Sequence, residues 1–329
     1  MHTSSPQLSI IVVVHNMPRQ AMNTLYSLSS AYQRDVDEAE YEVLVMENSS
    51  GNTLDAAAVE ALGSNFDYCL REEDGVSPAP AINAALARCR GAAVGLLIDG
   101  ARMLSPRVLA NALAALRLPG AIVAVPGYYL SAAGAVEGGT SAADAAAILA
   151  EEEALLAGSG WQDEGYALFD QACFSNGNRH GFMEPLMECN ALFCRTELLR
   201  QIGGADERFD LRGGGALNLH LYRQLATSPG SRLYMLGGEG NFHQFHGGTS
   251  TTAGDERDAL VQTFKAQLDS FWPGGFKGVR REPILFGPVA TQALPFLEAS
   301  LESTRLRARR LADQGRPLWE DEHLAGESS

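Results

Sequence analysis

The sequence predicts an α/β fold in which a mostly parallel, Rossmann-like sheet is flanked by helices. Two runs, residues 8–16 (LSIIVVVHN) and 41–52 (YEVLVMENSSGN), each begin with a short, continuous apolar segment and end in polar residues. A strand that is apolar on both faces must be covered on both sides, as parallel strands of α/β sheets are. Ligands of such sheets bind beyond the carboxyl ends of the strands. We therefore expect a small-molecule site where these polar residues fall.

Strand-like and helix-like segments alternate through the first 125 residues. Pro18 begins the helix after the first strand, and Gly63 ends the helix after the second. This alternation is typical of a doubly wound sheet. The predicted strands are 8–16, 41–47, 66–70, 92–98 and 121–125, and the predicted helices are 18–31, 53–62, 77–90 and 105–116.

The second half of the chain is less regular. Residues 131–185 form a predicted insertion near the open end of the sheet, with a helix over 142–156. The pattern then predicts strands at 187–195 and 232–236 and helices at 196–202, 217–226 and 294–312. We expect one domain over residues 1–250, followed by a helical C-terminal extension and an acidic tail over residues 251–329.

Composition narrows the class of protein. The 329 residues are 46% hydrophobic and 20% charged, as in ordinary globular proteins. No apolar run approaches the roughly 18–20 residues that span a bilayer, and the N-terminus lacks the features of a secretory signal. We therefore expect no membrane span and a cytoplasmic location. The net charge of −15 disfavours nucleic acid as a partner.

Five motifs, taken in order, resemble the family 2 glycosyltransferases, which are nucleotide-sugar-dependent enzymes with the GT-A fold. They are LSIIVVVHN, YEVLVMENSSGN, SPAPAINAALARCRG leading to GLLIDGA, CNALFCRTELLRQIGGADERFD with RGGGALNLHLYRQL, and HQFHGGTS, within residues 8–250. The resemblance implies a GT-A-type fold. It also implies inverting transfer of a sugar from a nucleotide-diphosphate donor, foremost a UDP-sugar. The residues do not identify the acceptor as a saccharide, a lipid or a peptide.

The resemblance also implies which residues bind the donor. Glu47 stands where the family usually has aspartate, and a carboxylate can accept from a base N–H or a ribose hydroxyl. Simple turn formation is the alternative role for Asn48 and Ser49. The implied donor-binding residues are Val14, His15, Asn16, Glu47, Asn48, Gly75, Asn83 and Asp99.

The metal motif of the family is incomplete in this chain. Relatives have aspartate, any residue, aspartate after the fourth strand, whereas this chain has Asp99, Gly100 and Ala101. His243 and His246 match a family position near the metal or the diphosphate. Neutral imidazole can ligate Mn²⁺, and protonated imidazole can pair with a phosphate oxygen. We expect Asp99, His243 and His246 to hold a divalent cation, Mn²⁺ or Mg²⁺. Packing and loop hydrogen bonds are the alternative role for the histidines.

The usual general base of the family is also missing. Gly215 and Ala216 stand where relatives have glutamate and aspartate ahead of a helix. Glu188 is the first candidate to replace the base and Glu184 the second, because burial near a sugar site can raise the pKa of a carboxyl group. An ordinary structural role for Glu188 is the alternative.

Two other functions remain open at this stage. The missing carboxylates favour a catalytically inactive relative that binds a nucleotide or sugar in the same cleft. A weaker hypothesis is an assembly protein that docks a partner, or another copy of the chain to form a homo-oligomer, through its C-terminal helix, which carries several arginines among leucines. A solvated, salt-bridged helix is the favoured explanation of these arginines. The arginines are Arg305, Arg307, Arg309 and Arg310.

Overall fold

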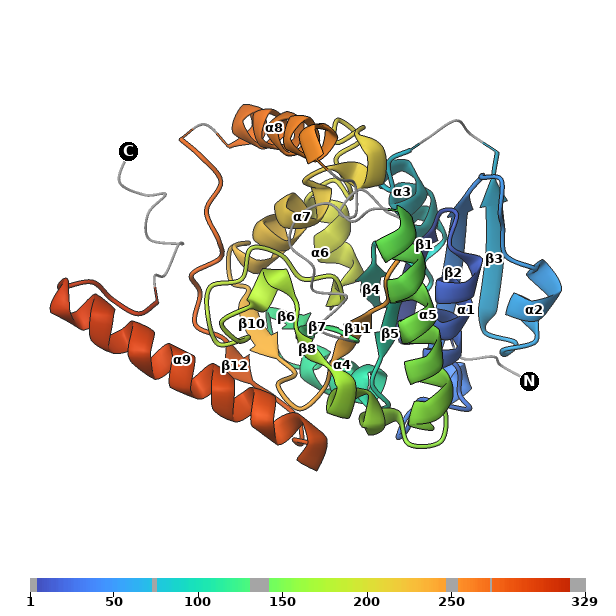
Figure 1. Ribbon diagram of the computed structural model, residues 1–329, viewed down its shortest axis with the longest axis horizontal. Coiled ribbons are helices and arrows are strands. Elements are labelled where there is room, and N and C mark those ends of the chain that lie inside the picture. The colour runs from blue at the N-terminus through green and yellow to red at the C-terminus, as the bar shows by residue number, and fades with distance from the viewer. Residues whose placement is uncertain (1–4, 73–75, 131–141, 247–253, 273, 320–329) are drawn as a thin grey trace.

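The computed structural model describes residues 5–72, 76–130, 142–246, 254–272 and 274–319, which fold around an eight-stranded sheet with helices on both faces (Figure 1). Its strands are β1 (Leu8–Val14), β2 (Tyr41–Asn48), β3 (Phe66–Arg71), β4 (Ala93–Leu97), β6 (Ala121–Ala124), β9 (Leu192–Arg195), β10 (Arg232–Met235) and β12 (Ile284–Leu285). They are arranged in the order β12-β10-β6-β9-β4-β1-β2-β3.

The central strand β1 is apolar on both faces and is completely buried. Ile11 and Val13 belong to one apolar core, and Ile10 and Val12 belong to another on the opposite face. Period-two alternation along the strand sends successive side chains to the two cores. The first core includes residues of α3 (Ala79–Arg88), α6 (Thr196–Gln201) and α7 (Leu217–Ala226), and the second includes residues of α1 (Pro18–Ser27), α2 (Ala56–Glu60) and α4 (Val108–Leu116).

The register of the sheet brings several chain segments to one edge. β1 runs parallel to both β2 and β4, with Val14 opposite Glu47, so the carboxyl ends of the three strands meet. Asp99 follows β4 at this edge. β9 is antiparallel to β4, and its first residue Leu192 pairs with Leu96. The segment before β9 therefore approaches the same edge from the opposite direction.

A second, smaller sheet lies beside the first. It consists of β5 (Arg102–Leu104), β11 (Asn241–His243), β7 (Gly127–Tyr129) and β8 (Cys173–Phe174), in that order. Tyr128 stacks on Phe242 at its centre, with ring centroids 5.6 Å apart. This aromatic core also receives residues from α5 (Ala142–Ser159) and from the 3-10 helix Gly165–Gln171.

The C-terminal part packs against the rest of the chain at several points. α8 (Gly254–Phe271) stacks Phe271 on Phe209 at 4.2 Å between ring centroids. α9 (Leu294–Asp313) places Arg307 Nε 3.1 Å from Glu184 Oε2, and β12 pairs with β10. The division of the chain at residue 250 stays a prediction. Among the described residues, no helix combines the length and apolarity needed to cross a membrane.

The fold class predicted from the sequence is confirmed: a mostly parallel sheet has helices on both faces. Several observed strands are shorter than predicted, and the difference is largest for strand 187–195. Strand 187–195 begins only at Leu192, and the residues before it form a loop. The second sheet and α8 were not predicted. Three strands of the second sheet have three residues each, and so short a segment shows no recognisable hydrophobic periodicity in the sequence.

Candidate functional site

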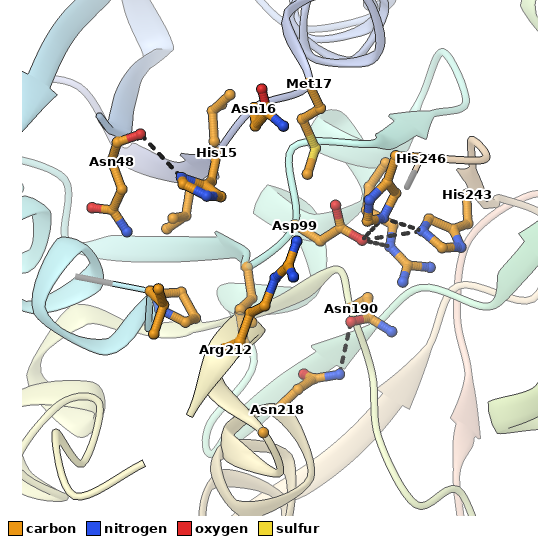
Figure 2. A pocket seen from close by; sticks show the side chains of 18 of the residues that line it. His15, Asn16, Met17, Asn48, Asp99, Asn190, Arg212, Asn218, His243 and His246 are labelled. Carbon is orange, nitrogen blue, oxygen red and sulfur yellow. Dashed lines mark hydrogen bonds and ion pairs between the residues drawn. The ribbon is translucent and has the colours of Figure 1, made fainter. Parts of the chain in front are cut away.

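A cavity of about 290 Å³ lies at the carboxyl edge of the main sheet (Figure 2). Eight residues predicted from the sequence line it: Val14, His15, Asn16, Asn48, Asp99, Glu188, His243 and His246. The wall also contains residues that the sequence did not indicate, among them Met17, Val76, Arg102, Asn190, Arg212 and Asn218. Segments far apart in the chain thus converge on one space large enough for part of a nucleotide sugar.

Glu47 was expected to contact the donor, but it does not line the cavity. Its side chain is fully buried, and Oε2 accepts hydrogen bonds from the Leu54 N–H at 3.0 Å and the Tyr68 hydroxyl at 2.7 Å. Neighbouring side chains of a strand point to opposite faces, so Asn48 faces the cavity while Glu47 does not. In this structure Glu47 anchors the loop after β2.

The remaining predicted residues are Asn83, Glu184 and Gly75. The Asn83 amide donates to the backbone oxygen of Ala205 at 2.9 Å and does not line the cavity. Glu184 is likewise absent from the wall and pairs with Arg307 of α9. Gly75 lies outside the described residues. Glu188 is therefore the only one of the two proposed base candidates that faces the cavity.

One end of the cavity is formed by the loops after β1 and β2. His15 Nδ1 lies 3.3 Å from the Asn48 backbone oxygen, and the Asn48 side chain donates to the Ser77 backbone oxygen at 3.2 Å. Asn16 adopts a left-handed conformation with φ of 55°, which asparagine tolerates better than most residues. These contacts hold two polar strand ends and the start of α3 together.

Asp99, His243 and His246 form a compact triad at the other end of the cavity, and Figure 2 shows their polar atoms facing one another. Asp99 Oδ2 lies 3.1 Å from His243 Nε2 and 3.4 Å from His246 Nε2. The two Nε2 atoms are 3.1 Å apart. All three atoms can therefore contact one ion.

The loop that carries the two histidines is held from several sides. Gln244, between them, is fully buried and donates to the Gln20 backbone oxygen of α1 at 2.9 Å. The Phe245 N–H donates to Glu152 of α5 at 2.7 Å, and Gln20 donates to the Phe245 oxygen at 2.8 Å. The insertion helix α5 therefore helps to fix the position of His246.

Burial and neighbouring charges set the protonation of the triad. Burial, reinforced by the Arg102 guanidinium, lowers the pKa of His243 to about 4, so its imidazole is neutral at pH 7. Burial alone would raise the pKa of Asp99, but His246, His243 and Arg102 hold that pKa well below its usual range. The triad thus offers a carboxylate and at least one neutral imidazole.

The triad fits a divalent cation. Metal–ligand bonds of about 2.1 Å place adjacent ligand atoms about 3.0–3.4 Å apart, the range of the three separations measured here. Two imidazoles and one carboxylate on one side leave coordination positions open toward a substrate. Arg102 Nε, 3.4 Å from Asp99 Oδ2, shares the carboxylate and lowers its charge toward a metal.

Glu188 is half-buried in the wall and is held by two asparagines. The Asn218 amide, in the first turn of α7, donates to Glu188 Oε2 at 2.8 Å and to Asn190 Oδ1 at 2.7 Å. The Asn190 amide also donates to Glu188 Oε1, at 3.5 Å, so the Glu188 carboxylate accepts one hydrogen bond from each asparagine. The two asparagines therefore fix the Glu188 carboxylate at the wall of the cavity that the triad also lines.

Comparisons with known proteins give matches only among solved structures. No family model matches the chain, and no curated protein matches its sequence. The mannosyltransferase PcManGT from Pyrobaculum calidifontis, solved with GDP-Man and Mn²⁺, is 16% identical over 92% of this chain and 71% of that one, with a TM-score of 0.48. S. aureus TarS is 14% identical over 80% of this chain, with a TM-score of 0.45.

A third similar structure is GalNAc-T7 with UDP, GalNAc and Mn²⁺, which is 12% identical over 73% of this chain and 42% of that one, with a TM-score of 0.45. The chain spans only 40% of the length of TarS. At these identities and TM-scores the likeness is limited to the general course of the backbone. The roles of individual residues therefore have to be argued from the geometry of the cavity.

Proposed function

We propose that the chain is an inverting glycosyltransferase of GT-A type. It takes a sugar from a nucleotide-diphosphate donor, foremost a UDP-sugar, and transfers it to a hydroxyl group of an acceptor. The observation that carries the proposal is the single cavity in which strand-end polar residues, the Asp99–His243–His246 triad and Glu188 converge. These three groups match the three needs of the reaction: nucleoside binding, diphosphate neutralisation and proton removal.

The donor's nucleoside belongs at the end formed by His15, Asn16 and Asn48. Two helices, α1 and α7, begin at the wall of the cavity, and no N-cap side chain bonds to their first turns. Free N–H groups at helix starts favour anionic ligands. N–H groups at these helix starts therefore offer the diphosphate of a nucleotide sugar both favourable electrostatics and hydrogen-bond donors.

Glu188 acts as the general base in this proposal. It accepts the proton of the acceptor hydroxyl while that oxygen bonds to the anomeric carbon and the bond from that carbon to the diphosphate oxygen breaks. The nucleoside diphosphate leaves from the opposite face, which inverts the configuration. Asn218 and Asn190 hold the carboxylate in place for this transfer.

The Asp99–His243–His246 triad would hold the divalent cation, whose chemistry when bound is to neutralise the charge that develops on the leaving diphosphate. The chain's own contribution is to keep the triad in position through Gln244 and Glu152. One carboxylate instead of two indicates weaker cation binding than a complete aspartate pair would give.

Nucleotide-sugar hydrolysis tests this proposal. With Mn²⁺ present, the purified chain is incubated with UDP- and GDP-sugars without an acceptor, and released nucleoside diphosphate is measured. We expect slow release that Asp99→Ala abolishes. If no nucleotide sugar or nucleoside diphosphate shifts the melting temperature of the protein, the proposal is wrong.

A second candidate function is binding without catalysis. It is favoured by Ala101 and Ala216, which are buried apolar residues where the family resemblance leads one to expect carboxylates. The same experiment separates the two: a thermal shift without any release of nucleoside diphosphate, with or without candidate acceptors, supports the binding protein.

A further inference from the structure

Two arginines line the cavity, and they differ in what they contact. Arg102 is buried, and its Nε lies 3.4 Å from Asp99 Oδ2. Arg212 is exposed, and no hydrogen bond or ion pair links its guanidinium to any residue that the structure describes. Figure 2 shows the Arg212 side chain reaching across the cavity toward Asp99. One guanidinium is therefore committed to a carboxylate, and the other is available to a ligand.

The backbone at Arg212 is held by a turn of three glycines. Gly213, Gly214 and Gly215 all have positive φ, between 56° and 78°. The Gly213 N–H donates to the Val76 oxygen at 2.9 Å, which ties the turn to the segment before α3. Added bulk at Gly214 would meet Pro78 at 2.8 Å, so only glycine allows this close approach.

The N–H groups of the turn are already used. Gly213 donates to Val76, Gly214 donates to Leu211 at 2.8 Å, and Gly215 makes a long bond of 3.5 Å to the Arg212 oxygen. The turn therefore does not bind an anion through its backbone. Its contribution to the cavity is the side chain of Arg212.

The charges of the wall indicate which ligand this side chain serves. Asp99 and Glu188 are carboxylates within a cavity proposed to receive an anionic donor. Arg102 offsets Asp99 and is therefore not a free cationic side chain for the donor's phosphates, which would carry more negative charge than the triad's cation alone neutralises. Guanidinium groups bind phosphate through two parallel N–H donors. Arg212 is the cation among the described residues of the wall that can supply them.

We propose that the Arg212 guanidinium binds the diphosphate of the donor and assists its departure. This inference rests on the proposed function. The location supports the diphosphate over the base, because Arg212 reaches toward Asp99, while Asn16 and Asn48 line the other end (Figure 2). A phosphate group of an acceptor is the other source of the same chemistry.

Calorimetric titration distinguishes these possibilities. UDP, GDP, uridine and guanosine are titrated into the wild type, Arg212→Gln, Arg212→Lys and the control Arg117→Gln, all with Mn²⁺. Arg117 is an exposed arginine outside the cavity. We expect Arg212→Gln to weaken binding of the preferred nucleoside diphosphate about ten- to a hundredfold, from loss of charge-assisted hydrogen bonds. Arg212→Lys retains part of the affinity, and Arg117→Gln retains all of it.

Binding of the free nucleoside separates this role from a structural one. We expect uridine or guanosine to bind Arg212→Gln as it binds the wild type. Unchanged binding of the diphosphate by Arg212→Gln overturns the inference, including the case in which Arg212 serves an acceptor phosphate. An equal loss for nucleoside and diphosphate also overturns it. If the wild type itself binds no nucleoside diphosphate, the proposed function fails and takes the inference with it.

Discussion

Arg102 and His243 are direct partners across the antiparallel pair β5–β11. Because Arg102 follows Asp99 by three residues, this pairing brings His243 Nε2 to 3.1 Å from the Asp99 carboxylate. His246 then approaches from the loop after β11. The small second sheet therefore determines the geometry of the triad, although the triad lies at the edge of the main sheet.

Removing one ligand of the triad should weaken cation binding. We expect Asp99→Asn, His243→Ala and His246→Ala each to lower Mn²⁺ affinity about tenfold or more, since even the loss of a partner of a metal ligand has effects of that size. Isothermal titration with Mn²⁺ and UDP measures this. His180→Ala, an exposed histidine outside the cavity, is the control. Affinities equal to that of the control would contradict the assignment.

Glu188→Gln should separate binding from catalysis. The amide cannot accept the acceptor's proton, and general bases contribute about 10²–10⁴-fold to rates. We expect the turnover rate of the nucleotide sugar to fall by a factor within that range, while the affinity for the nucleotide sugar is retained. Glu197→Gln, an exposed position on α6, serves as the matched control. Full activity of Glu188→Gln would exclude Glu188 as the base.

Restoring the family's second aspartate at position 101 should not repair the metal site. Ala101 is fully buried, and its N–H donates to Asp99 Oδ1 at 3.0 Å. Introducing a carboxylate there should lower the free energy of unfolding by on the order of 3 kcal/mol, because a buried charge lacks a partner. Urea denaturation of Ala101→Asp and of the small control Ala101→Ser measures the effect. Tighter Mn²⁺ binding with unchanged stability would show that the expectation is wrong.

Much of the fold could be predicted because the strands of the main sheet carry continuous apolar runs. β1, β2 and β4 are buried along their whole length, and this pattern is visible in the sequence alone. The ends of parallel strands meet at one edge, so Asn16, Asn48 and Asp99 could be placed near each other without coordinates. The second sheet could not be predicted, because β5, β7 and β11 are too short to show a period.

The candidate site was predicted less completely, for two physical reasons. Glu47 and Asn48 are adjacent, and a shift of one residue along a strand reverses which face a side chain occupies. The sequence does not show which of them faces the cavity. Arg212 and Asn218 lie near a glycine turn whose place beside Asp99 depends on the packing of α7. Asn218 stood within a segment already considered for its missing base, but its contact with Glu188 required the folded chain.

Glu152 should give the protein a measurable pH dependence. Burial raises the pKa of Glu152 from 4.5 to about 7. Between pH 4.5 and about pH 7, Glu152 is therefore protonated in the folded state and ionised in the unfolded state. The free energy of unfolding consequently falls as the pH rises through this interval. We expect the wild type to lose on the order of 2 kcal/mol relative to Glu152→Gln between pH 5 and pH 8.

Urea denaturation of both proteins at the two pH values measures this difference. Glutamine can still accept from the Phe245 N–H, so the variant keeps the contact that holds the histidine loop. Glu151→Gln, at an exposed position of the same helix, is the control and should follow the wild type. Parallel curves for the wild type and Glu152→Gln would contradict a proton held at this site.

The most direct measurement is pulsed electron paramagnetic resonance of Mn²⁺ bound to the chain together with UDP. If the cavity holds the donor's diphosphate beside the triad, the spectrum will show ¹⁴N couplings from two imidazoles and ³¹P couplings from UDP on the same ion. His243→Ala and His246→Ala will each remove one imidazole coupling. A spectrum without nitrogen couplings, or one that neither substitution changes, would contradict the account.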